Sequence, residues 1–223
     1  MNKLGHLAFI MDGNNRWAKK TNNTKYYSYK YGAKKILTIA DKLFKSYKLN
    51  EISAFALSTH NLKRPKSILK IIENILVEFL DSTLKGEKLK YKINFLGNLN
   101  FLNKEIIDKI RLIEKNNSNK KQRLNLFINY SGQEDILNSI NQFLKKKEKF
   151  SKFTFEKYLC TNNLPMPDIL IRTGGFNRIS DFMLYEIAFT ELFFLNKLWP
   201  EINITDVKKI IHKFHRTERK FGI

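Results

Sequence analysis

Apolar residues along the chain fall into two alternating patterns. Short runs of mainly apolar residues, as in residues 7–10 and 52–57, are typical of strands that are buried on both faces of a parallel sheet. Between these runs, apolar residues recur at every third or fourth position, which is the spacing of an amphipathic helix. Further apolar runs predict strands at residues 91–96, 124–128, 168–171 and 192–195. We therefore predict an α/β fold: one domain over residues 1–223, with a largely parallel six-stranded sheet flanked by helices.

Helices are expected in six segments of the chain. They cover residues 36–47, 65–84, 106–113, 136–144, 180–188 and 207–214. Residues 21–30 are polar and rich in tyrosine, and we expect a loop there. The helix over residues 65–84 has the broadest apolar face, with Pro65 suited to its first turn and Gly86 to its end.

Polar residues and glycines follow five of the predicted strands, at the points where the strands end. In chain order they are Asp12; Ser58, Asn61 and Arg64; Gly97; Asn129; and Arg172, Gly174 and Gly175. In a parallel sheet these ends share one edge, which is where open α/β folds bind ligands. Turn chemistry alone does not explain such a set from five separate loops, so we predict one polar site at this edge.

The sequence Arg-Thr-Gly-Gly-x-x-Arg-x-Ser at residues 172–180 has the composition of a phosphate site. Its two glycines would allow the backbone to wrap an anion with N–H groups, ahead of a helix N-terminus. Arg172 and Arg178 add planar guanidinium groups that match phosphate oxygens, and Ser180 adds a hydroxyl that can also cap the helix. No Gly-Lys-Ser/Thr follows, which excludes a Walker A loop. The alternative is a glycine turn with surface arginines.

Asp12 is the best candidate for a metal ligand. A single carboxylate beside diphosphate oxygens suits Mg²⁺, which keeps several waters and takes few protein ligands. Glu191, just before the sixth predicted strand, is a candidate second carboxylate, with a solvent-exposed residue beside the strand as the alternative. His212 and His215 lie one helical turn apart, but no third ligand supports a zinc site.

Charge narrows the class of partner without deciding it. The chain has 41 Lys and Arg against 21 Asp and Glu, a net charge of +20, which favours nucleic acid, an anionic membrane surface or a diphosphate substrate. The one cysteine, Cys160, excludes an internal disulfide framework and fits a reducing cytoplasm. No apolar run has the length of a membrane span and no signal peptide is evident, so we expect a cytoplasmic protein.

Five motifs occur in the order found in the cis-prenyltransferases, the undecaprenyl diphosphate synthase family. They are Asp-Gly-Asn-x-Arg-Trp at residues 12–17, Ser-x-x-Asn-x-x-Arg-Pro at 58–65, the 172–180 motif, Glu-Leu-x-Phe at 191–194 with Trp-Pro at 199–200, and Arg-x-Phe-Gly at 219–222. The chain resembles this family over its whole length, and its bacterial members most. The resemblance implies a Mg²⁺-dependent enzyme that condenses isopentenyl diphosphate onto an allylic diphosphate, expected to be farnesyl diphosphate. The product would be an undecaprenyl-type carrier lipid for cell-wall glycan synthesis.

The resemblance also implies a role for each site residue. Asp12 would bind Mg²⁺ and help the allylic diphosphate to leave, with Glu191 assisting the metal. Gly13, Asn14 and Arg16 would cradle the allylic diphosphate, and Arg172, Arg178 and Ser180 would hold isopentenyl diphosphate. Asn61, as a catalytic residue, and Arg64 would act near the condensing carbons. Further substrate-binding residues would be Trp17, Lys25, Tyr29 and Ser58.

Three features of the molecule's wider setting also follow from the resemblance. A homodimer is expected, as is transient contact with the inner face of the membrane for release of the product. The growing chain would lie in an apolar tunnel between the sheet and the helix over residues 65–84.

Several positions differ from the usual residues of bacterial family members. Here Asn15 replaces Gly, Lys25 and Tyr29 replace Arg and His, His60 and Leu62 replace Glu and Trp, and Phe176 replaces Glu. Because tyrosine does not supply the positive charge of an imidazolium, these differences leave the starter and the product length open. Two other functions are considered: a basic nucleic-acid-binding protein, which lacks a recognised reading motif, and a catalytically silent accessory subunit. The accessory-subunit alternative is disfavoured because the chain retains Asp12, Arg172 and Arg178.

Overall fold

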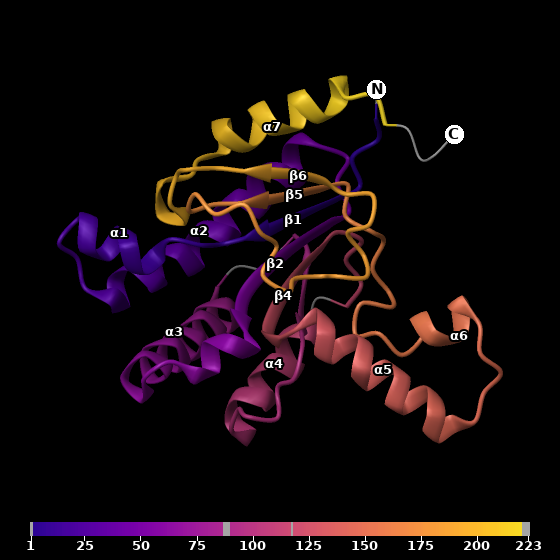
Figure 1. Ribbon diagram of the computed structural model, residues 1–223. Helices are drawn as coiled ribbons and strands as arrows, with labels where there is room; N and C mark the ends of the chain where they lie inside the picture. Colours follow the sequence, from indigo (N-terminus) through magenta and orange to yellow (C-terminus); the bar gives the residue numbers. More distant parts are fainter. Residues whose placement is uncertain (1, 87–89, 117, 220–223) are drawn as a thin grey trace.

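The computed structural model describes residues 2–86, 90–116 and 118–219, with six parallel strands at its centre (Figure 1). The strands are β1 His6–Ile10, β2 Glu51–Ser58, β3 Lys92–Leu96, β4 Arg123–Tyr130, β5 Ile169–Arg172 and β6 Glu191–Phe194. They lie in the order β3-β4-β2-β1-β5-β6, which confirms the predicted parallel sheet. In the register, Ile10 pairs with Phe55 on one side and with Arg172 on the other. The loops after β1, β2 and β5 therefore leave the sheet at the same edge.

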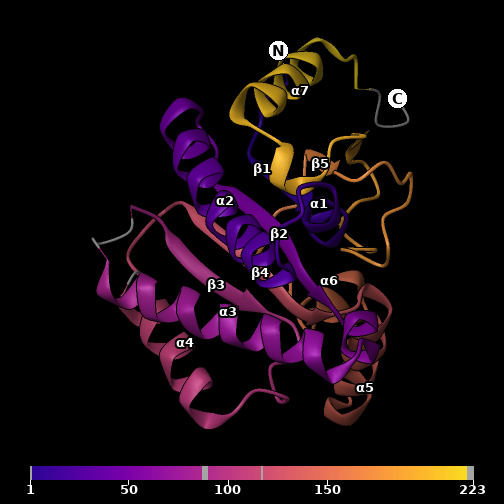
Figure 2. The same ribbon diagram turned by 90° about the vertical axis from the view of Figure 1, so that its left-hand side faces the viewer.

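Helices and loops cover both faces of the sheet. The helices are α1 Asn14–Lys20, α2 Lys25–Ser46, α3 Lys66–Lys85, α4 Lys104–Asn116, α5 Gly132–Lys146, α6 Lys152–Glu156 and α7 Ile204–Arg216, with short 3₁₀ segments at Thr59–Lys63 and Trp199–Glu201. Alternate residues of β1 serve two cores: Leu7 and Phe9 pack with α2, α3, α4 and α7, whereas Ala8 and Ile10 pack with Phe182. Figure 2 shows α2 and α3 crossing the first of these faces side by side. No described helix is long and apolar enough to span a membrane.

The region after β1 is more helical than the sequence pattern predicts. The chain enters α1 directly at Asn14, and the predicted loop over residues 21–30 is wrong beyond its first few residues, because α2 begins at Lys25. Thr24 provides the reason, since its Oγ1 accepts a hydrogen bond from the backbone N–H of Tyr27 at 3.1 Å and so caps the helix. The tyrosines of this segment therefore lie on a helix next to the site.

The predicted helix over residues 180–188 is also wrong. This segment is a series of turns, and Ser180, Asp181 and Met183 have φ values of 50°, 65° and 49°. A right-handed helix requires negative φ at every residue, so three left-handed residues within four positions exclude it. Ser180 consequently caps no helix.

Candidate active site

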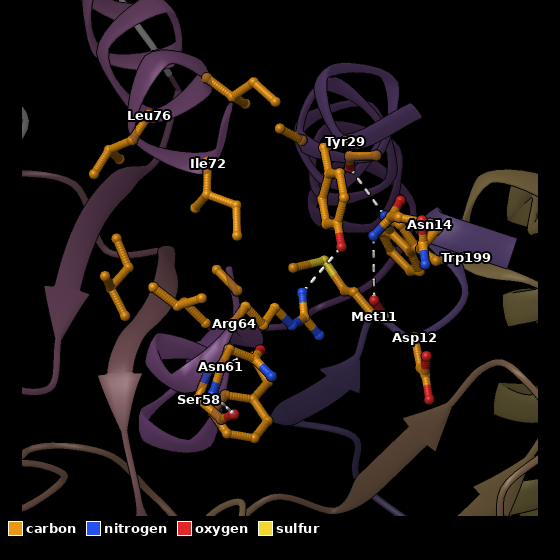
Figure 3. A pocket seen from close by; sticks show the side chains of 18 of the residues that line it. Met11, Asp12, Asn14, Tyr29, Ser58, Asn61, Arg64, Ile72, Leu76 and Trp199 are labelled. Carbon is orange, nitrogen blue, oxygen red and sulfur yellow. Dashed lines mark hydrogen bonds between the residues drawn. The ribbon is translucent and has the colours of Figure 1, made fainter. Parts of the chain in front are cut away.

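A cavity of about 800 Å³ opens at the carboxyl edge of the sheet and extends beneath α3 (Figure 3). Its polar end is lined by residues from the loops that follow three strands and from α1 and α2. From the predicted set these are Asp12, Gly13, Asn14, Arg16, Tyr29, Ser58, Asn61, Arg64, Arg172, Arg178 and Ser180. The fold therefore brings together residues that are up to 168 positions apart in the sequence.

Asp12 lies between two arginine side chains. Its Oδ1 is 3.3 Å from Arg16 Nη2, and its Oδ2 accepts a hydrogen bond from Arg172 Nη2 at 3.0 Å. The backbone carbonyl of Asp12 accepts two further bonds, from Thr173 Oγ1 at 2.8 Å and from the Trp199 N–H at 2.9 Å. The backbone of Asp12 is thus held by two hydrogen bonds, while 31% of its side chain is exposed toward the cavity.

Arg172 is buried, with only 4% of its surface exposed, and it organises the loop that follows β5. Its Nη1 donates to the carbonyl of Arg178 and, at 2.6 Å, to Ser180 Oγ. Its Nε is buried without a hydrogen-bond partner among the described residues. Buried donors are nearly always satisfied, so this unpartnered N–H is an exception in the site.

The two glycines of the 172–180 motif do not wrap an anion in the predicted way. The N–H of Gly174 donates to the carbonyl of Lys197 at 2.8 Å, and that of Gly175 donates to the carbonyl of Leu195 at 2.9 Å. Both have positive φ, 91° and 76°, and a Cβ on Gly174 would collide with the Arg16 guanidinium. Gly174 therefore makes room for the Arg16 side chain, and neither glycine offers its N–H to an anion.

The Ser-x-x-Asn-x-x-Arg segment after β2 forms a reciprocal cap. Ser58 Oγ accepts from the Asn61 N–H at 3.3 Å, and Asn61 Oδ1 accepts from the Ser58 N–H at 3.4 Å. This capping box starts the 3₁₀ turn over Thr59–Lys63 and directs Arg64 into the cavity. There Arg64 Nη1 donates to Tyr29 Oη at 2.9 Å, which links this loop to α2 (Figure 3).

The other end of the cavity is apolar and lies under α3. On the apolar face of α3, Ile72, Ile75, Leu76 and Phe79 line the cavity, whereas Ile68 does not. Ile36, Leu126 and Ile128 form part of the opposite wall. One continuous space therefore joins a cationic end to an apolar end.

Three of the predicted site residues, Trp17, Lys25 and Glu191, do not line the cavity. Trp17 stacks on Tyr31, with ring centroids 5.4 Å apart, and Lys25 is exposed at the start of α2. Glu191 is the first residue of β6 and pairs with Ile169 at the start of β5. Asp12 follows the opposite end of the strands, so a single chain does not bring these two carboxylates to one metal. The parallel direction of β6 decides this, because Glu191 stands where β6 begins and Asp12 lies beyond the end of β1.

The donor set at the polar end fits a Mg²⁺ ion held by one carboxylate. The described residues contain no group of three His, Cys, Asp or Glu side chains that could hold a metal by themselves. Mg²⁺ typically takes one or two carboxylates and completes its shell with water and substrate phosphates. Asp12, partly exposed between two arginines, matches that pattern.

Two other residues near the site have structural roles. Trp199, for which the sequence pattern predicts no role of its own, is fully buried, and its Nε1 donates to the Gly32 carbonyl at 2.9 Å. Because the backbone N–H of Trp199 also donates to the Asp12 carbonyl, Trp199 connects α2 to the end of β1. Cys160 donates to Asp135 Oδ2 at 3.2 Å, and burial raises the pKa of its thiol, as does the Asp135 carboxylate. A protonated, half-buried thiol of this kind is not a nucleophile.

Comparison with known proteins places these features in a family. Residues 10–222 match the family described as "Putative undecaprenyl diphosphate synthase". The chain is 35% identical to the tritrans,polycis-undecaprenyl-diphosphate synthase (geranylgeranyl-diphosphate specific) of Pyrobaculum aerophilum, over 97% of this chain and 95% of that protein. It is 34% identical to the isoprenyl transferase of Thermotoga maritima, over 97% and 96% of the two chains.

Solved structures agree with this match. Lavandulyl diphosphate synthase from Lavandula x intermedia, in complex with dimethylallyl diphosphate, superposes with a TM-score of 0.91 at 26% identity, over 98% of both chains. A probable undecaprenyl diphosphate synthase from Campylobacter jejuni superposes with a TM-score of 0.81 at 28% identity, over 100% of both chains. The chain belongs to the undecaprenyl diphosphate synthase-like family of cis-prenyltransferases.

Proposed function

We propose that the protein is a Mg²⁺-dependent cis-prenyltransferase that extends an allylic diphosphate, farnesyl diphosphate, with isopentenyl diphosphate to an undecaprenyl-type carrier lipid. One observation carries the proposal: a single cavity that is cationic at the sheet edge and apolar beneath α3. A prenyl diphosphate has the same division, with a highly charged head and an apolar tail. The carrier lipid would serve cell-wall glycan synthesis.

In the proposed reaction, the double bond of isopentenyl diphosphate forms a carbon–carbon bond to the allylic carbon while inorganic diphosphate leaves that carbon. A proton is then lost from C2 of the isopentenyl unit to the released diphosphate, which leaves the new double bond. Arg16 and Asn14, beside Asp12, hold the departing diphosphate at the sheet edge. Mg²⁺, held by Asp12, would neutralise charge on that leaving group. Asn61 and Arg64 lie between this edge and the apolar end, where the condensing carbons would meet.

Isopentenyl diphosphate is assigned to the loop after β5. Arg178 is exposed toward the cavity and makes no ion pair within the described part of the chain, so its guanidinium is available for a phosphate. Arg172 has a buried Nε that lacks a partner there, and Ser180 Oγ lies 2.6 Å from Arg172 Nη1. These donors suit the oxygens of a diphosphate group.

A single assay tests the proposal. The protein is incubated with labelled isopentenyl diphosphate, farnesyl diphosphate and Mg²⁺, and the mass and double-bond geometry of the product are measured. We expect a long product whose added units are all cis. Salt-sensitive RNA binding with no prenyl transfer would favour a nucleic-acid-binding protein. Activity only after addition of a second, catalytic chain would indicate an accessory subunit.

The proposal includes a homodimer. Its support is an exposed apolar stripe on α5, where Leu137, Ile140 and Leu144 lie at helical spacing with exposed fractions of 59%, 40% and 62%. Unpartnered stripes of this kind often mark protein–protein contacts. Light scattering of the wild type and of a Leu137→Glu, Leu144→Glu variant would test it, since a monomeric wild type contradicts the proposal.

We also propose a cytoplasmic protein that meets the inner face of the membrane to release its product. The support is the net charge of +20, which attracts anionic lipid headgroups. Co-sedimentation with vesicles that contain phosphatidylglycerol should exceed that with phosphatidylcholine vesicles, and should fall with salt. Equal binding to both kinds of vesicle would contradict an electrostatic contact.

A further inference from the structure

The ring of Phe176 lies among three arginine side chains. The guanidinium carbon of Arg178 is 4.3 Å from the ring centroid, that of Arg16 is 4.9 Å away, and that of Arg172 is 5.6 Å away. The three arginines come from different places: α1, the end of β5 and the loop that follows it. All three also line the polar end of the cavity. The cationic cluster therefore converges on Phe176.

This convergence brings three positive charges together with little to neutralise them. Asp12 is the carboxylate paired with Arg16 and Arg172, and no ion pair of Arg178 is found in the described residues. Like charges at this separation repel one another, and long side chains can separate by changing rotamer. An aromatic face attracts each guanidinium group and opposes that separation.

The backbone on both sides of Phe176 is fixed. Before it, the N–H groups of Gly174 and Gly175 are bonded to the carbonyls of Lys197 and Leu195 at the exit of β6. After it, Arg172 Nη1 donates to the Arg178 carbonyl and so closes the loop. The ring is thus presented from a short loop that is tied at both ends, although 39% of its surface is exposed.

We propose that Phe176 is a positioning residue that pre-organises the arginine cluster for the diphosphate of isopentenyl diphosphate. An aromatic face attracts a guanidinium group through its flat side and leaves the N–H donors in the plane of the group free for phosphate oxygens. A carboxylate at this position would take up those same donors. The ring therefore holds Arg16 and Arg178 in place without competing with the anionic ligand.

The inference rests on the proposed function, because it takes the ligand to be the substrate of that reaction. It adds a determinant of affinity that lies outside the cavity lining and touches the ligand only through the arginines. Without the ring, Arg16 and Arg178 would have to be ordered at the moment of binding, and each ordered side chain reduces affinity.

The test compares Phe176→Leu, which keeps apolar bulk but removes the aromatic face, with Phe176→Tyr, which keeps the face. Binding of isopentenyl diphosphate is measured by calorimetry, and KM and kcat are measured separately. Phe176→Leu should weaken binding and raise KM for isopentenyl diphosphate about tenfold, with kcat within about twofold, as expected for the ordering of two long side chains. Phe176→Tyr should restore wild-type affinity.

Phe153→Leu serves as a matched control, because Phe153 is 78% exposed on α6, which lies on the opposite side of the molecule from α1 (Figure 1). The affinity of this variant for isopentenyl diphosphate should equal that of the wild type. A Phe176→Leu variant that binds as tightly as the wild type overturns the inference. So does an equal loss in the Leu and Tyr variants, which would indicate a packing role. If the wild type itself neither binds isopentenyl diphosphate nor forms product, the proposed function fails instead.

Discussion

Charged side chains have different surroundings at the two edges of the sheet: the amino edge, where the strands begin, and the carboxyl edge, where they end. At the amino edge, Glu51 is almost fully buried, yet its oxygens accept bonds from Arg123 Nε at 2.6 Å and from Asn125 Nδ2 at 2.9 Å. Asp168 at the same edge accepts from the N–H groups of Gly5 and His6 at 2.7 and 3.1 Å. At the carboxyl edge, Asp12 pairs with Arg16 and Arg172, whereas Arg178 beside them has no ion pair among the described residues.

This difference separates stability from function. A buried ionic group that has all its partners is costly to disrupt but offers nothing to a ligand. Guanidinium groups that outnumber the carboxylates beside a cavity can instead bind an anion. The anion would supply the missing negative charge and hydrogen-bond acceptors. Changes at the amino edge should therefore affect folding, and changes at the carboxyl edge should affect turnover.

The largest effect is expected for Asp12→Ala. Turnover should fall roughly a hundred- to a thousandfold, as is typical when a pre-organised electrostatic group is removed from an active site. The thermal midpoint should fall less than in Arg123→Met, because Asp12 is partly exposed, although the buried Arg172 loses its carboxylate. Excess chelator should have the same effect on the wild type. Full activity in chelator would contradict the metal assignment.

Arg123→Met tests the amino edge. It leaves Glu51 buried without its cation, and the free energy of unfolding should fall by about 3 kcal/mol. Measured by urea denaturation, the loss should far exceed that of Arg111→Met, a matched change in a pair whose side chains are 75% and 53% exposed. The folded fraction should retain normal kcat. A selective loss of kcat would mean that the two edges are not separate in function.

Arg178→Ala tests the excess of cations at the carboxyl edge. A hydrogen bond to a charged group is worth roughly 1.5–3 kcal/mol, so KM for isopentenyl diphosphate should rise about ten- to a hundredfold. Stability should be retained, since Arg178 is exposed. An effect confined to the allylic substrate would reverse the assignment of the two subsites.

The pH dependence of stability tests His6 at the amino edge. Burial lowers the pKa of His6 to about 4 from its ordinary value of 6.5, and its Nε2 lies 2.8 Å from Ser53 Oγ. Between these two values the unfolded chain binds a proton that the folded chain does not, so stability is present above pH 6.5 and is lost as the pH falls toward 4. The unfolding free energy should be about 2 kcal/mol lower at pH 5 than at pH 7.

Urea denaturation at the two pH values checks this expectation. His6→Gln should flatten the pH dependence, whereas the exposed His212→Gln should preserve it. An unchanged slope in His6→Gln would assign the acid sensitivity to other groups.

The smallest effect on stability is expected for Ile75→Trp at the apolar end of the cavity. In a packed core, the added bulk would cost about 1–3 kcal/mol through overpacking. Because Ile75 lines the cavity, the change should be tolerated, and the product should be shorter since the growing chain meets the ring early. Melting temperature and product mass should be measured for Trp at positions 68, 72, 75, 76 and 79. Losses of stability with no shift in product would place the growing chain elsewhere.

The parallel sheet and the polar residues at its carboxyl edge follow from the amino-acid sequence alone. Buried parallel strands need runs of mainly apolar residues, and each run is recognised from neighbours in the chain, as at residues 7–10 and 52–57. The chain must leave each such run at the same edge of the sheet. Asp12, Arg64 and Arg172 are therefore predicted to lie together, and all three do line the cavity. The last motif, at residues 219–222, lies outside the described residues beyond Arg219.

The connections among those residues depend on the tertiary structure. The Thr24 cap and the left-handed residues at Ser180 and Met183 set local backbone in ways that composition does not signal. Glu191 begins β6, and because β6 runs parallel to β1 it lies at the edge opposite Asp12. In the sequence, Phe176 is noted only as a replacement for the glutamate that is usual in bacterial family members. Its contact with three arginines depends on where three separate segments meet in space, and no single segment contains that information.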